Sequence, residues 1–560
     1  MTSAADLSTT LQVLVRSGVV RPRGPVALSR IVRTVRRWGT GPAGGFAQLA
    51  AVQPDAVAVV DERGELTFGQ LHRRTNALAR ALAERGVGER DQVAVMCRNH
   101  RGFVEATVAV AKLGGDLLYL NTAFAGPQLA DVLAREKPVL LVHDEEFTDL
   151  LAGAGPWPRV LAWTDGGGGS GSGGGDRRGG GAVAARPGLP ESSVPEPPEE
   201  HLEALVQGRS TQDLQPPGHH SRCVILTSGT TGTPKGAPRK EAGIHNGVAL
   251  MSRLPLQAGW RSHVAAPLFH TWGLAHMYMA MLLGSTLVLR RHFDPEQALR
   301  TLQDEECESF VVIPVMLQRI LALPAEVREG YDTSSLRVTA SSGSALPGDL
   351  ALEWMDAFGD NLYNVYGSTE VAYASIATPQ DLRAAPDAAG RPPLATVVKI
   401  LDAERREVAP GESGRIFVRN KMLFDGYTGG GGKEVVDGLM ATGDLGRFDA
   451  DGRLHVEGRD DEMIISGGEN VFPREVEDCL CRHEDVQDAA AVGVEDTGFG
   501  RRLRAFVVLK ESAVADEEVL KRWVGTNLAR YKVPREIVFL DELPRNATGK
   551  VLKRVLADRP

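Results

Sequence analysis

Cysteine is scarce in this sequence, with five in 560 residues. The five are scattered and form no C-x-x-C pair, so we expect neither a disulfide framework nor a zinc site. No stretch reaches about eighteen uninterrupted apolar residues, which argues against a transmembrane helix. The N-terminus also lacks the apolar segment of a secretory signal. Together these absences predict a reducing, cytoplasmic location.

Excess positive charge is missing as well. Lysine and arginine number 63 against 72 aspartates and glutamates, which gives a formal net charge of -9. We therefore expect no nucleic-acid partner. The 42% hydrophobic and 24% charged content is typical of a globular protein, and the length exceeds one ordinary domain.

The first 40 residues depart from this acidic balance because they are rich in arginine. Apolar side chains recur there at helical spacing, and most of the arginines fall on the other side of the expected helix. A basic amphipathic helix can lie on an anionic membrane surface, which makes residues 1–40 a possible peripheral membrane contact. The alternative is a helix packed on its own domain. The apolar residues are Leu28, Ile31, Val32, Val35 and Trp38, and the arginines are Arg30, Arg33, Arg36 and Arg37.

From about residue 45 the pattern alternates between short apolar strands and amphipathic helices. This pattern predicts an α/β fold with largely parallel sheets. We expect a basic segment at 1–44, a large multi-layered α/β body at 45–458 and a small mobile α+β domain at 459–560. The Gly-, Pro- and Glu-rich stretch at 165–215 is expected to be a disordered insertion. Expected strands lie at 57–61, 93–97, 117–120, 139–142, 223–227, 263–266, 286–289, 309–313 and 336–340, and expected helices lie at 66–84 and 104–112.

The sharpest motif is the ten-residue string TSGTTGTPKG at 227–236, which follows an expected strand. Its glycines allow a tight turn, its hydroxyls and N–H groups can surround phosphate oxygens, and Lys235 adds a positive charge. It lacks the Gly-Lys-Ser/Thr ending of a Walker A loop. Taken alone, the string could equally be a flexible surface loop.

Five further motifs follow in order, and with the first they resemble the signatures of the acyl-adenylate-forming enzymes. They are NVYGSTE at 364–370, TGD at 442–444, GRDD at 458–461, SGGEN at 466–470 and PRNATGK at 544–550. The resemblance extends from about residue 45 to the end, apart from the low-complexity insertion. It implies that a carboxylate reacts with ATP to give an acyl-adenylate and pyrophosphate. The thiol of coenzyme A then displaces AMP.

The resemblance also implies roles for the matched residues. Tyr366 offers an aromatic face to adenine. Asp444 and Arg459 bind the ribose, Asp461 is the hinge between the domains, and Lys550 bridges the carboxylate and the α-phosphate. The implied catalytic residues are Lys550, Glu370, His270 and Lys235. The implied nucleotide-binding residues are Thr227, Ser228, Gly229, Thr230, Thr231, Gly232, Gly343, Ser344, Asn364, Tyr366, Gly367, Thr369, Asp444, Arg459, Gly467 and Gly468. The implied cofactors are ATP, coenzyme A and Mg²⁺, with Thr230 and Glu370 as metal ligands.

The nature of the acid depends on the segment around His270, which by resemblance borders the acyl pocket. The residues that follow it are apolar and rich in methionine, and Gly273 and Ala275 are expected to leave room beside an acyl chain. The string at 463–473 also resembles fatty-acyl and medium-chain acyl-CoA ligases. We therefore expect a medium- or long-chain fatty acid. Two alternatives stay open: transfer of the acyl group to a carrier-protein phosphopantetheine, and a non-catalytic relative that only binds nucleotide.

Overall fold

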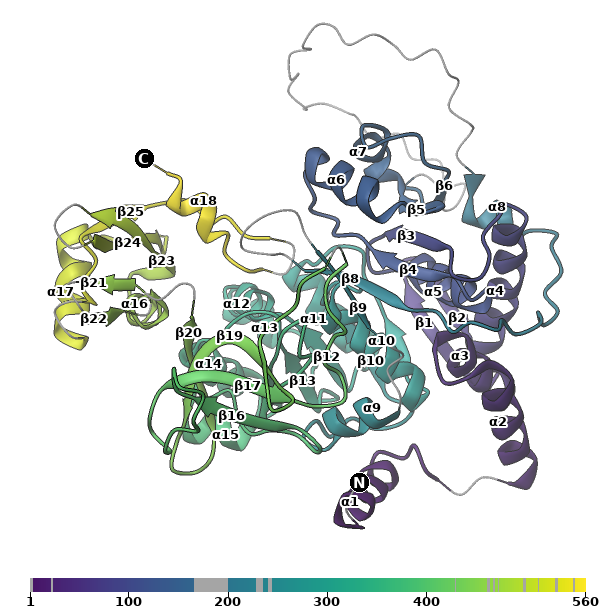
Figure 1. Ribbon diagram of the computed structural model, residues 1–560, viewed down its shortest axis with the longest axis horizontal. Helices are drawn as coiled ribbons and strands as arrows, with labels where there is room; N and C mark the ends of the chain where they lie inside the picture. Colours follow the sequence, from purple (N-terminus) through teal and green to yellow (C-terminus); the bar gives the residue numbers. More distant parts are fainter. Residues whose placement is uncertain are drawn as a thin grey trace, which may run out of the picture.

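The computed structural model describes most of the chain. The described residues form a large body with three β-sheets and a smaller C-terminal domain with a fourth (Figure 1). The segment 166–181, expected to be low-complexity and disordered, lies outside the residues described. Those residues are 4–21, 24–165, 200–227, 235–239, 244–428, 430–460, 464–466, 469–471, 473–496, 500–511, 513–528, 532–546 and 549–559.

The first sheet of the body has the order β7-β6-β5-β3-β4-β8-β9 among the described strands. Neighbours pair in parallel except for β8 and β9, which form an antiparallel pair with Thr227 opposite Lys235. Its strands are β3 (Gln92–Met96), β4 (Asp116–Tyr119), β5 (Leu140–Asp144), β6 (Arg159–Trp163), β7 (Glu200–His201), β8 (Cys223–Thr227) and β9 (Lys235–Arg239).

The second sheet has the order β15-β14-β13-β12-β10-β11-β1-β2 within the same described ranges. Its central strands are parallel, and β15 and β2 add antiparallel edges. The strands are β1 (Val57–Asp61), β2 (Gly64–Thr67), β10 (Arg261–Val264), β11 (Thr286–Val288), β12 (Ser309–Val312), β13 (Val338–Ser341), β14 (Leu362–Tyr366) and β15 (Ser375–Ala377). The predicted α/β class with largely parallel sheets is confirmed.

Helix α5 (Arg101–Lys112) is buried on every side, and its apolar side chains share one core with strands of both sheets. Three charged residues on it are satisfied inside the protein, as buried charges must be. Arg101 pairs with Asp61, Glu105 with Arg74, and the Lys112 ammonium donates to Asn76 Oδ1 at 2.6 Å. Burial lowers the pKa of Lys112 to about 7.

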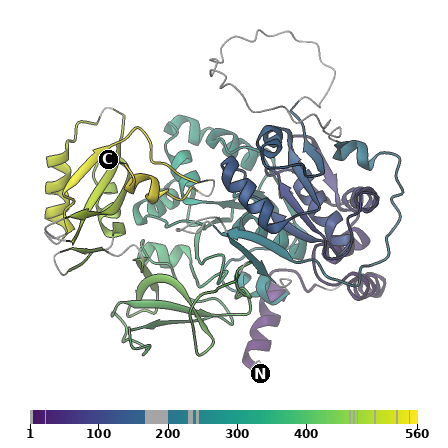
Figure 2. The same cartoon turned by 45° about the horizontal axis from the view of Figure 1, so that its top comes forward.

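Other helices of the body lie on the faces of these sheets (Figure 2). Helix α4 begins with a capping box, in which the Thr67 and Gln70 side chains bond reciprocally to the backbone. The helices of the body are α1 (Ala4–Arg16), α2 (Pro25–Trp38), α3 (Pro42–Val52), α4 (Phe68–Ala83), α6 (Gly126–Glu136), α7 (Thr148–Ala152), α8 (Leu202–Val206), α9 (Ile244–Met251), α10 (Thr271–Leu283), α11 (Pro295–Asp304), α12 (Pro314–Leu321), α13 (Ala325–Glu329), α14 (Gly348–Phe358) and α15 (Pro379–Ala384), with a 3₁₀ turn η1 (Glu145–Phe147).

A third, antiparallel sheet closes the body and was not expected from the sequence. Strand β19 lies at its centre, between β17 and β20, and Asp444 on β19 pairs in register with Arg459 on β20. Its strands are β16 (Val397–Leu401), β17 (Gly414–Arg419), β18 (Val435–Val436), β19 (Leu439–Phe448) and β20 (Leu454–Arg459).

The C-terminal domain has its own sheet and core, which matches the predicted small α+β unit. Helices α16 (Pro473–Cys481) and α17 (Glu517–Asn527) supply Val476, Leu480 and Leu520 to that core. The remaining elements are α18 (Lys553–Ala557), β21 (Ile464–Ser466), β22 (Glu469–Val471), β23 (Val486–Asp496), β24 (Gly500–Leu509) and β25 (Glu536–Phe539). Within the ranges given above, no helix combines the length and apolarity needed to cross a membrane.

The predicted disorder of 165–215 is wrong for residues 200–215. Leu202 and Leu205 on α8 are each only 2% exposed because they pack into the core of the body. Arg80 on α4 donates to the carbonyls of Ser210 and Gln212, which ties the following turn to the same helix. The prediction relied on composition alone. Two buried leucines and hydrogen bonds to the backbone are enough to order this stretch, and composition does not reveal them.

Candidate functional site

Three of the predicted nucleotide-binding residues meet where β14 approaches the third sheet. The hydroxyl of Tyr366, the last residue of β14, donates to Asp444 Oδ2 at 2.5 Å. Arg459 lies beside the same carboxylate, with 3.6 Å between its Nη1 and Asp444 Oδ1. Burial, and next the negative charge of Asp444, raise the pKa of Tyr366 well above its ordinary value. The phenol therefore stays neutral and can donate.

The backbone around Tyr366 leaves no room for side chains. A Cβ atom on Gly367 would lie 2.1 Å from the Ala372 carbonyl oxygen, so only glycine fits there. Asn364, two residues earlier on β14, is buried, and Thr369 is half-buried on the turn that follows. This part of the predicted site is a compact turn at the end of a strand, where ligands of open α/β sheets bind.

Lys235 and Glu370 are brought together by a residue that the sequence analysis missed. The Tyr427 hydroxyl donates to Glu370 Oε1 at 2.7 Å, and the Lys235 ammonium lies 5.4 Å from the centre of the same ring. Thr428 continues this link, since its Oγ1 accepts from the Gly236 N–H at 3.0 Å. Tyr427 follows an Asp-Gly pair in a loop, and such a loop offers no periodic signal that could have revealed it.

The loop that carries Lys550 lies against the large body. A Cβ atom on Gly549 would be 2.6 Å from Val315 Cγ1 and 3.1 Å from Ile313 Cδ1. Ile313 also faces Gly343, whose own Cβ would lie 3.2 Å from Ile313 Cγ2. The structure thus places the lysine loop next to the Gly343 loop, with Ile313 between them. Ser344 is half-buried beside Gly343.

His270 is the N-cap residue of α10 and packs against Phe269, with ring centroids 4.5 Å apart. Its Nε2 is buried and has no hydrogen-bond partner among the described residues. Burial lowers its pKa to about 4, so the imidazole is neutral at physiological pH. A neutral, unpartnered ring nitrogen at a helix start is suited to contact a ligand rather than to stabilise the fold.

The predicted acyl wall is wrong at Gly273. A Cβ atom at this position would lie 2.3 Å from the Pro267 carbonyl oxygen, so Gly273 is required by a close backbone contact and not by an open channel. Met277 and Met279 are buried in the core. The side chains of α10 that keep accessible surface are instead Thr271, Trp272, Ala275 and Tyr278, followed by Met281 and Leu282.

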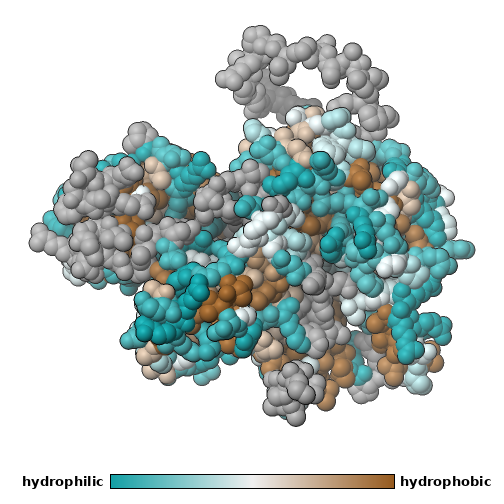
Figure 3. Space-filling model, in the orientation of Figure 1, coloured by the Kyte–Doolittle hydropathy of each residue, from teal (hydrophilic) through white to brown (hydrophobic). Residues whose placement is uncertain are grey.

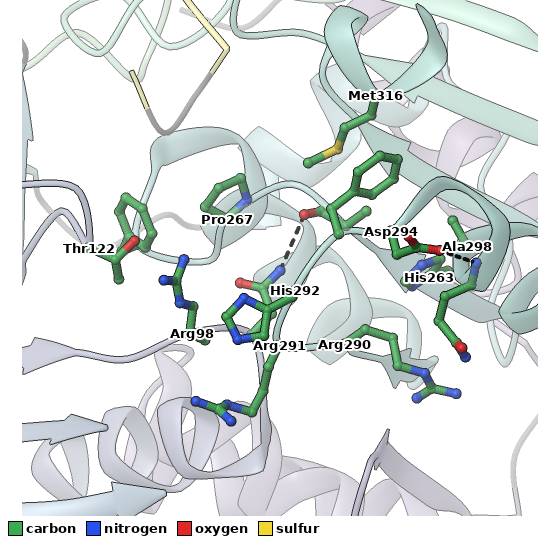
Figure 4. A pocket seen from close by; sticks show the side chains of 15 residues that line it. Arg98, Thr122, His263, Pro267, Arg290, Arg291, His292, Asp294, Ala298 and Met316 are labelled. Atoms are coloured by element: carbon green, nitrogen blue, oxygen red, sulfur yellow. Dashed lines mark hydrogen bonds between the residues drawn. The ribbon is translucent and has the colours of Figure 1, made fainter. Parts of the chain in front are cut away.

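A pocket of about 170 Å³ adjoins the segment that ends at His270 (Figure 4). Arg98 and His292 lie next to each other on its rim, near Pro267 and Thr122. Glu146 pairs with Arg98 at 2.6 Å and with Arg291 at 2.8 Å. These ion pairs hold the guanidinium groups in place, so the pocket has a polar rim of fixed geometry.

One buried group could in principle hold a metal ion: Cys97, His100 and Asp144. Both ring nitrogens of His100 are already engaged, one with Asp144 Oδ1 at 2.8 Å and the other with the Gly102 N–H at 3.0 Å. Asp144 Oδ2 also accepts from the Arg98 N–H at 2.8 Å. The cluster therefore positions the start of α5 and the backbone of Arg98.

Several predicted site residues cannot be placed. Glu370 offers a carboxylate of the kind that Mg²⁺ takes, but its expected companion ligand lies outside the described residues. Thr227 is described in its backbone alone, at the end of β8. The residues outside the described ranges are Ser228, Gly229, Thr230, Thr231, Gly232, Asp461, Gly467 and Gly468.

Comparison with known proteins agrees with this arrangement. Residues 46–428 match the family model of the AMP-binding enzyme, and residues 475–550 match that of the AMP-binding enzyme C-terminal domain. A 2-succinylbenzoate–CoA ligase of Geobacillus kaustophilus (strain HTA426) is 34% identical over 91% of this chain and 96% of its own. A feruloyl-CoA synthase of Amycolatopsis sp. is 33% identical over 90% of this chain and 96% of its own.

A solved structure extends the likeness to three dimensions. The anthranilate CoA ligase AuaEII in complex with anthranoyl-AMP superposes with a TM-score of 0.78 at 25% identity, over 92% of this chain and 96% of its own. The chain belongs to the AMP-binding enzyme family. It is an AMP-forming acid–thiol ligase, which activates an acyl or aryl acid through an adenylate.

Proposed function

We propose that the acid is a medium- or long-chain fatty acid, joined first to AMP and then to coenzyme A. The observation that carries this proposal is a stripe of accessible side chains on α10, a helix otherwise largely packed into the core. Thr271, Ala275 and Tyr278 recur at helical spacing, and each keeps accessible surface. The stripe begins next to His270 and runs about 10 Å along the helix axis, at 1.5 Å per residue.

Tyr278 defines the far end of this stripe. Its hydroxyl lies 3.0 Å from Cys223 Sγ, and burial raises its pKa well above the ordinary value. Because Tyr278 lies this deep and still keeps accessible surface, we infer that it borders an internal space. No side chain of the stripe is charged, so the space suits an aliphatic chain and not an amino acid. An extended chain with its carboxylate at His270 would run along this stripe toward Tyr278.

The catalytic roles proposed here are those that the family resemblance implies, and the contacts described above support them. Asp444 and Arg459 would hold the ribose, and Tyr366 would hold adenine while its hydroxyl fixes the Asp444 carboxylate. Lys235 and Lys550 would offset the negative charge that develops when the carboxylate attacks the α-phosphate. Glu370, oriented by Tyr427, would bind Mg²⁺, which supplies charge neutralisation to the phosphates.

An aryl acid is the second candidate, and two observations favour it. The names of the relatives specify 2-succinylbenzoate and ferulate, and the solved neighbour holds anthranoyl-AMP. Trp272, directly after the first residue of the stripe, is fixed by a hydrogen bond from its Nε1 to the Val312 carbonyl at 3.0 Å. A fixed, half-exposed indole offers a flat surface on which an aromatic ring could stack.

A panel of acids separates the two candidates. AMP release should be measured as kcat/KM for straight-chain acids from acetate to palmitate, with ferulate, benzoate, indoleacetate and several amino acids beside them. A fatty-acid enzyme should gain roughly fourfold for each buried methylene, which corresponds to about 0.8 kcal/mol, until the space ends. A flat profile with chain length and a preference for an aryl acid would replace the first candidate by the second.

Tyr278→Ala tests the far wall directly. Removing the ring should move the preferred chain length to longer acids and leave KM for ATP unchanged. Tyr331→Ala, which alters a tyrosine on the α13 side of the body, is the matched control and should keep the wild-type profile.

The same assay with coenzyme A as sole acceptor decides between CoA and a carrier protein. No thioester with CoA would favour the carrier.

A further inference from the structure

The first 32 residues hold an unusual share of the apolar surface. Of the twelve large hydrophobic side chains that are exposed in the described ranges, six lie between residues 11 and 32. On α1 these are Leu11 and Val15, which are 56% and 55% exposed. The remaining four are Val20, Val26, Leu28 and Val32. A concentration of this kind marks an interaction surface.

The opposite faces of the same helices are firmly packed. Trp38 on α2 is 4% exposed and lies in a cluster with Ala43, Ala47 and Ala111. Val13 and Leu14 on α1 pack against the core below α9, and the Ala258 N–H donates to the Ser17 carbonyl at 2.8 Å. The expectation of a helix packed on its own domain is therefore met on the inner face. The exposed residues are held in place on an anchored scaffold.

The charge of this segment is opposite to that of the rest of the chain. Residues 1–40 contain seven arginines, no lysine and a single acidic residue, Asp6, which gives a formal charge of +6. Since the whole chain carries -9, the remaining residues carry -15. Such an asymmetry orients a protein in the field of a negatively charged surface.

The arginines of α2 divide into two groups. Arg30 donates to the Ala51 carbonyl, and Arg37 donates to the Leu214 carbonyl, so both are used to dock the helix. Arg33 and Arg36 are exposed, and the described part of the chain provides no acidic partner within salt-bridge distance of either. Arg36 follows Leu28 and Val32 at four-residue spacing on the same face of the helix, and all three side chains are exposed.

Both helices lie along one edge of the molecule. Figures 1 and 2 place α1 and α2 at the lower edge of the body. Figure 3 shows hydrophobic and hydrophilic surface side by side at the lower right, where α2 lies. Apolar side chains interleaved with arginines are the pattern of a helix that lies in the headgroup region of a bilayer.

We propose that α1 and α2 form a docking surface for an anionic lipid bilayer, with Arg33 and Arg36 at the phosphates and Leu28, Val32, Leu11 and Val15 at the acyl boundary. Two other partners fit this surface less well. A protein with a neutral polar face would leave the arginines without counter-charges, and a second copy of this chain would place its own basic segment against them. An anionic lipid surface satisfies the charge and the apolar side chains together. Docking would hold the enzyme at the lipid bilayer, into which apolar acids partition from water.

Vesicle flotation with the full-length protein tests the proposal. Wild type should float with phosphatidylcholine vesicles that contain phosphatidylserine and remain in solution with phosphatidylcholine alone. Binding should weaken steeply as salt rises, since surface charges are screened within about 10 Å at 0.1 M. Arg33→Glu with Arg36→Glu should weaken binding by at least about tenfold. Arg522→Glu with Lys510→Glu, the same charge change on the C-terminal domain, should leave it unchanged.

Leu28→Ser with Val32→Ser tests the apolar contribution and should weaken binding to the vesicles that contain phosphatidylserine at low salt, although the charge is unchanged. In all variants the melting temperature and the acid-dependent release of pyrophosphate should equal those of wild type without vesicles. Absence of wild-type binding to anionic vesicles would overturn the proposal, as would equal loss in the control pair. A concentration-dependent dimer that the Leu28 and Val32 variant abolishes, without vesicle binding, would show that a second copy covers this surface.

Discussion

Gly549 and Val315 are in contact across the two domains: a Cβ atom on the glycine would lie 2.6 Å from Val315 Cγ1. A hydrogen bond from Gln318 Nε2 to the Gln487 carbonyl, 2.9 Å long, joins the same two parts of the chain. These contacts place the loop of Lys550 on the body, beside Gly343. This placement supports the proposed role of Lys550 in the first half-reaction.

Gly549→Ala should disturb this orientation. The residue has φ +75 and no room for a methyl group, so adenylation should fall at least about tenfold. Gly452→Ala is a matched control, because Gly452 has the same φ of 75 and nothing within 4 Å of its Cβ position. Both variants carry the same backbone strain. An equal loss of adenylation in the two would show that strain, and not the contact with Val315, is responsible.

Lys550→Ala should reduce acyl-adenylate formation by roughly a hundredfold to a thousandfold, the usual effect of removing one group that stabilises developing charge. Thioester formation from supplied acyl-AMP should persist, because the proposed mechanism assigns the lysine loop to adenylation alone. Lys510→Ala, on an exposed residue at the end of β24, is the control. Single-turnover assays of the two half-reactions measure both effects, and equal losses in both would contradict the assignment.

Asp444→Asn should raise KM for ATP by roughly ten- to a hundredfold, since a hydrogen bond to a charged group contributes about 1.5–3 kcal/mol. Tyr366→Phe removes one partner of the same carboxylate and should have a smaller effect in the same direction. Tyr363→Phe on the same strand serves as the control. Isothermal titration with ATP measures the affinities, and unchanged binding in Asp444→Asn would exclude this carboxylate from the nucleotide site.

Stability should fall as the pH drops from 6.5 toward 4. Burial lowers the pKa values of His263, His270 and His276 to about 4, whereas an unfolded histidine titrates near 6.5. Between these values the unfolded chain binds more protons than the folded one, so stability rises with pH across the interval and is complete above it. Melting curves at pH 7, 6, 5 and 4.5 should show the decline. His276→Gln should reduce it, and His292→Gln, at an exposed position, should not.

Much of this architecture was predictable because buried strands and amphipathic helices leave periodic patterns. The strand that ends at Thr227 and the helix that ends at Lys112 followed from such patterns, whereas the strand that ends at Tyr366 was not predicted. Tyr366, Asp444 and Arg459 lie far apart in sequence, and only their resemblance to a family brought them together before the structure did. In the structure Asp444 and Arg459 are opposite each other in register on β19 and β20.

Other features had no readable signal. Gly273 resembled a channel residue, but the carbonyl oxygen of Pro267, six residues earlier, occupies the space that a side chain would need. Tyr427 contacts Glu370 through a loop, and loops carry no periodicity. Residues 200–215 read as disordered because their composition is polar, whereas their order depends on contacts with α4. In all three cases the decisive contacts leave no periodic pattern in the sequence.

The products of ATP cleavage test the central claim most directly. Purified enzyme should be incubated with ATP, Mg²⁺, coenzyme A and the preferred acid, and the nucleotides and phosphates separated by chromatography. The account predicts AMP and pyrophosphate in equal amounts, formed only when the acid is present and lost in Lys550→Ala. Formation of ADP and inorganic phosphate would contradict it.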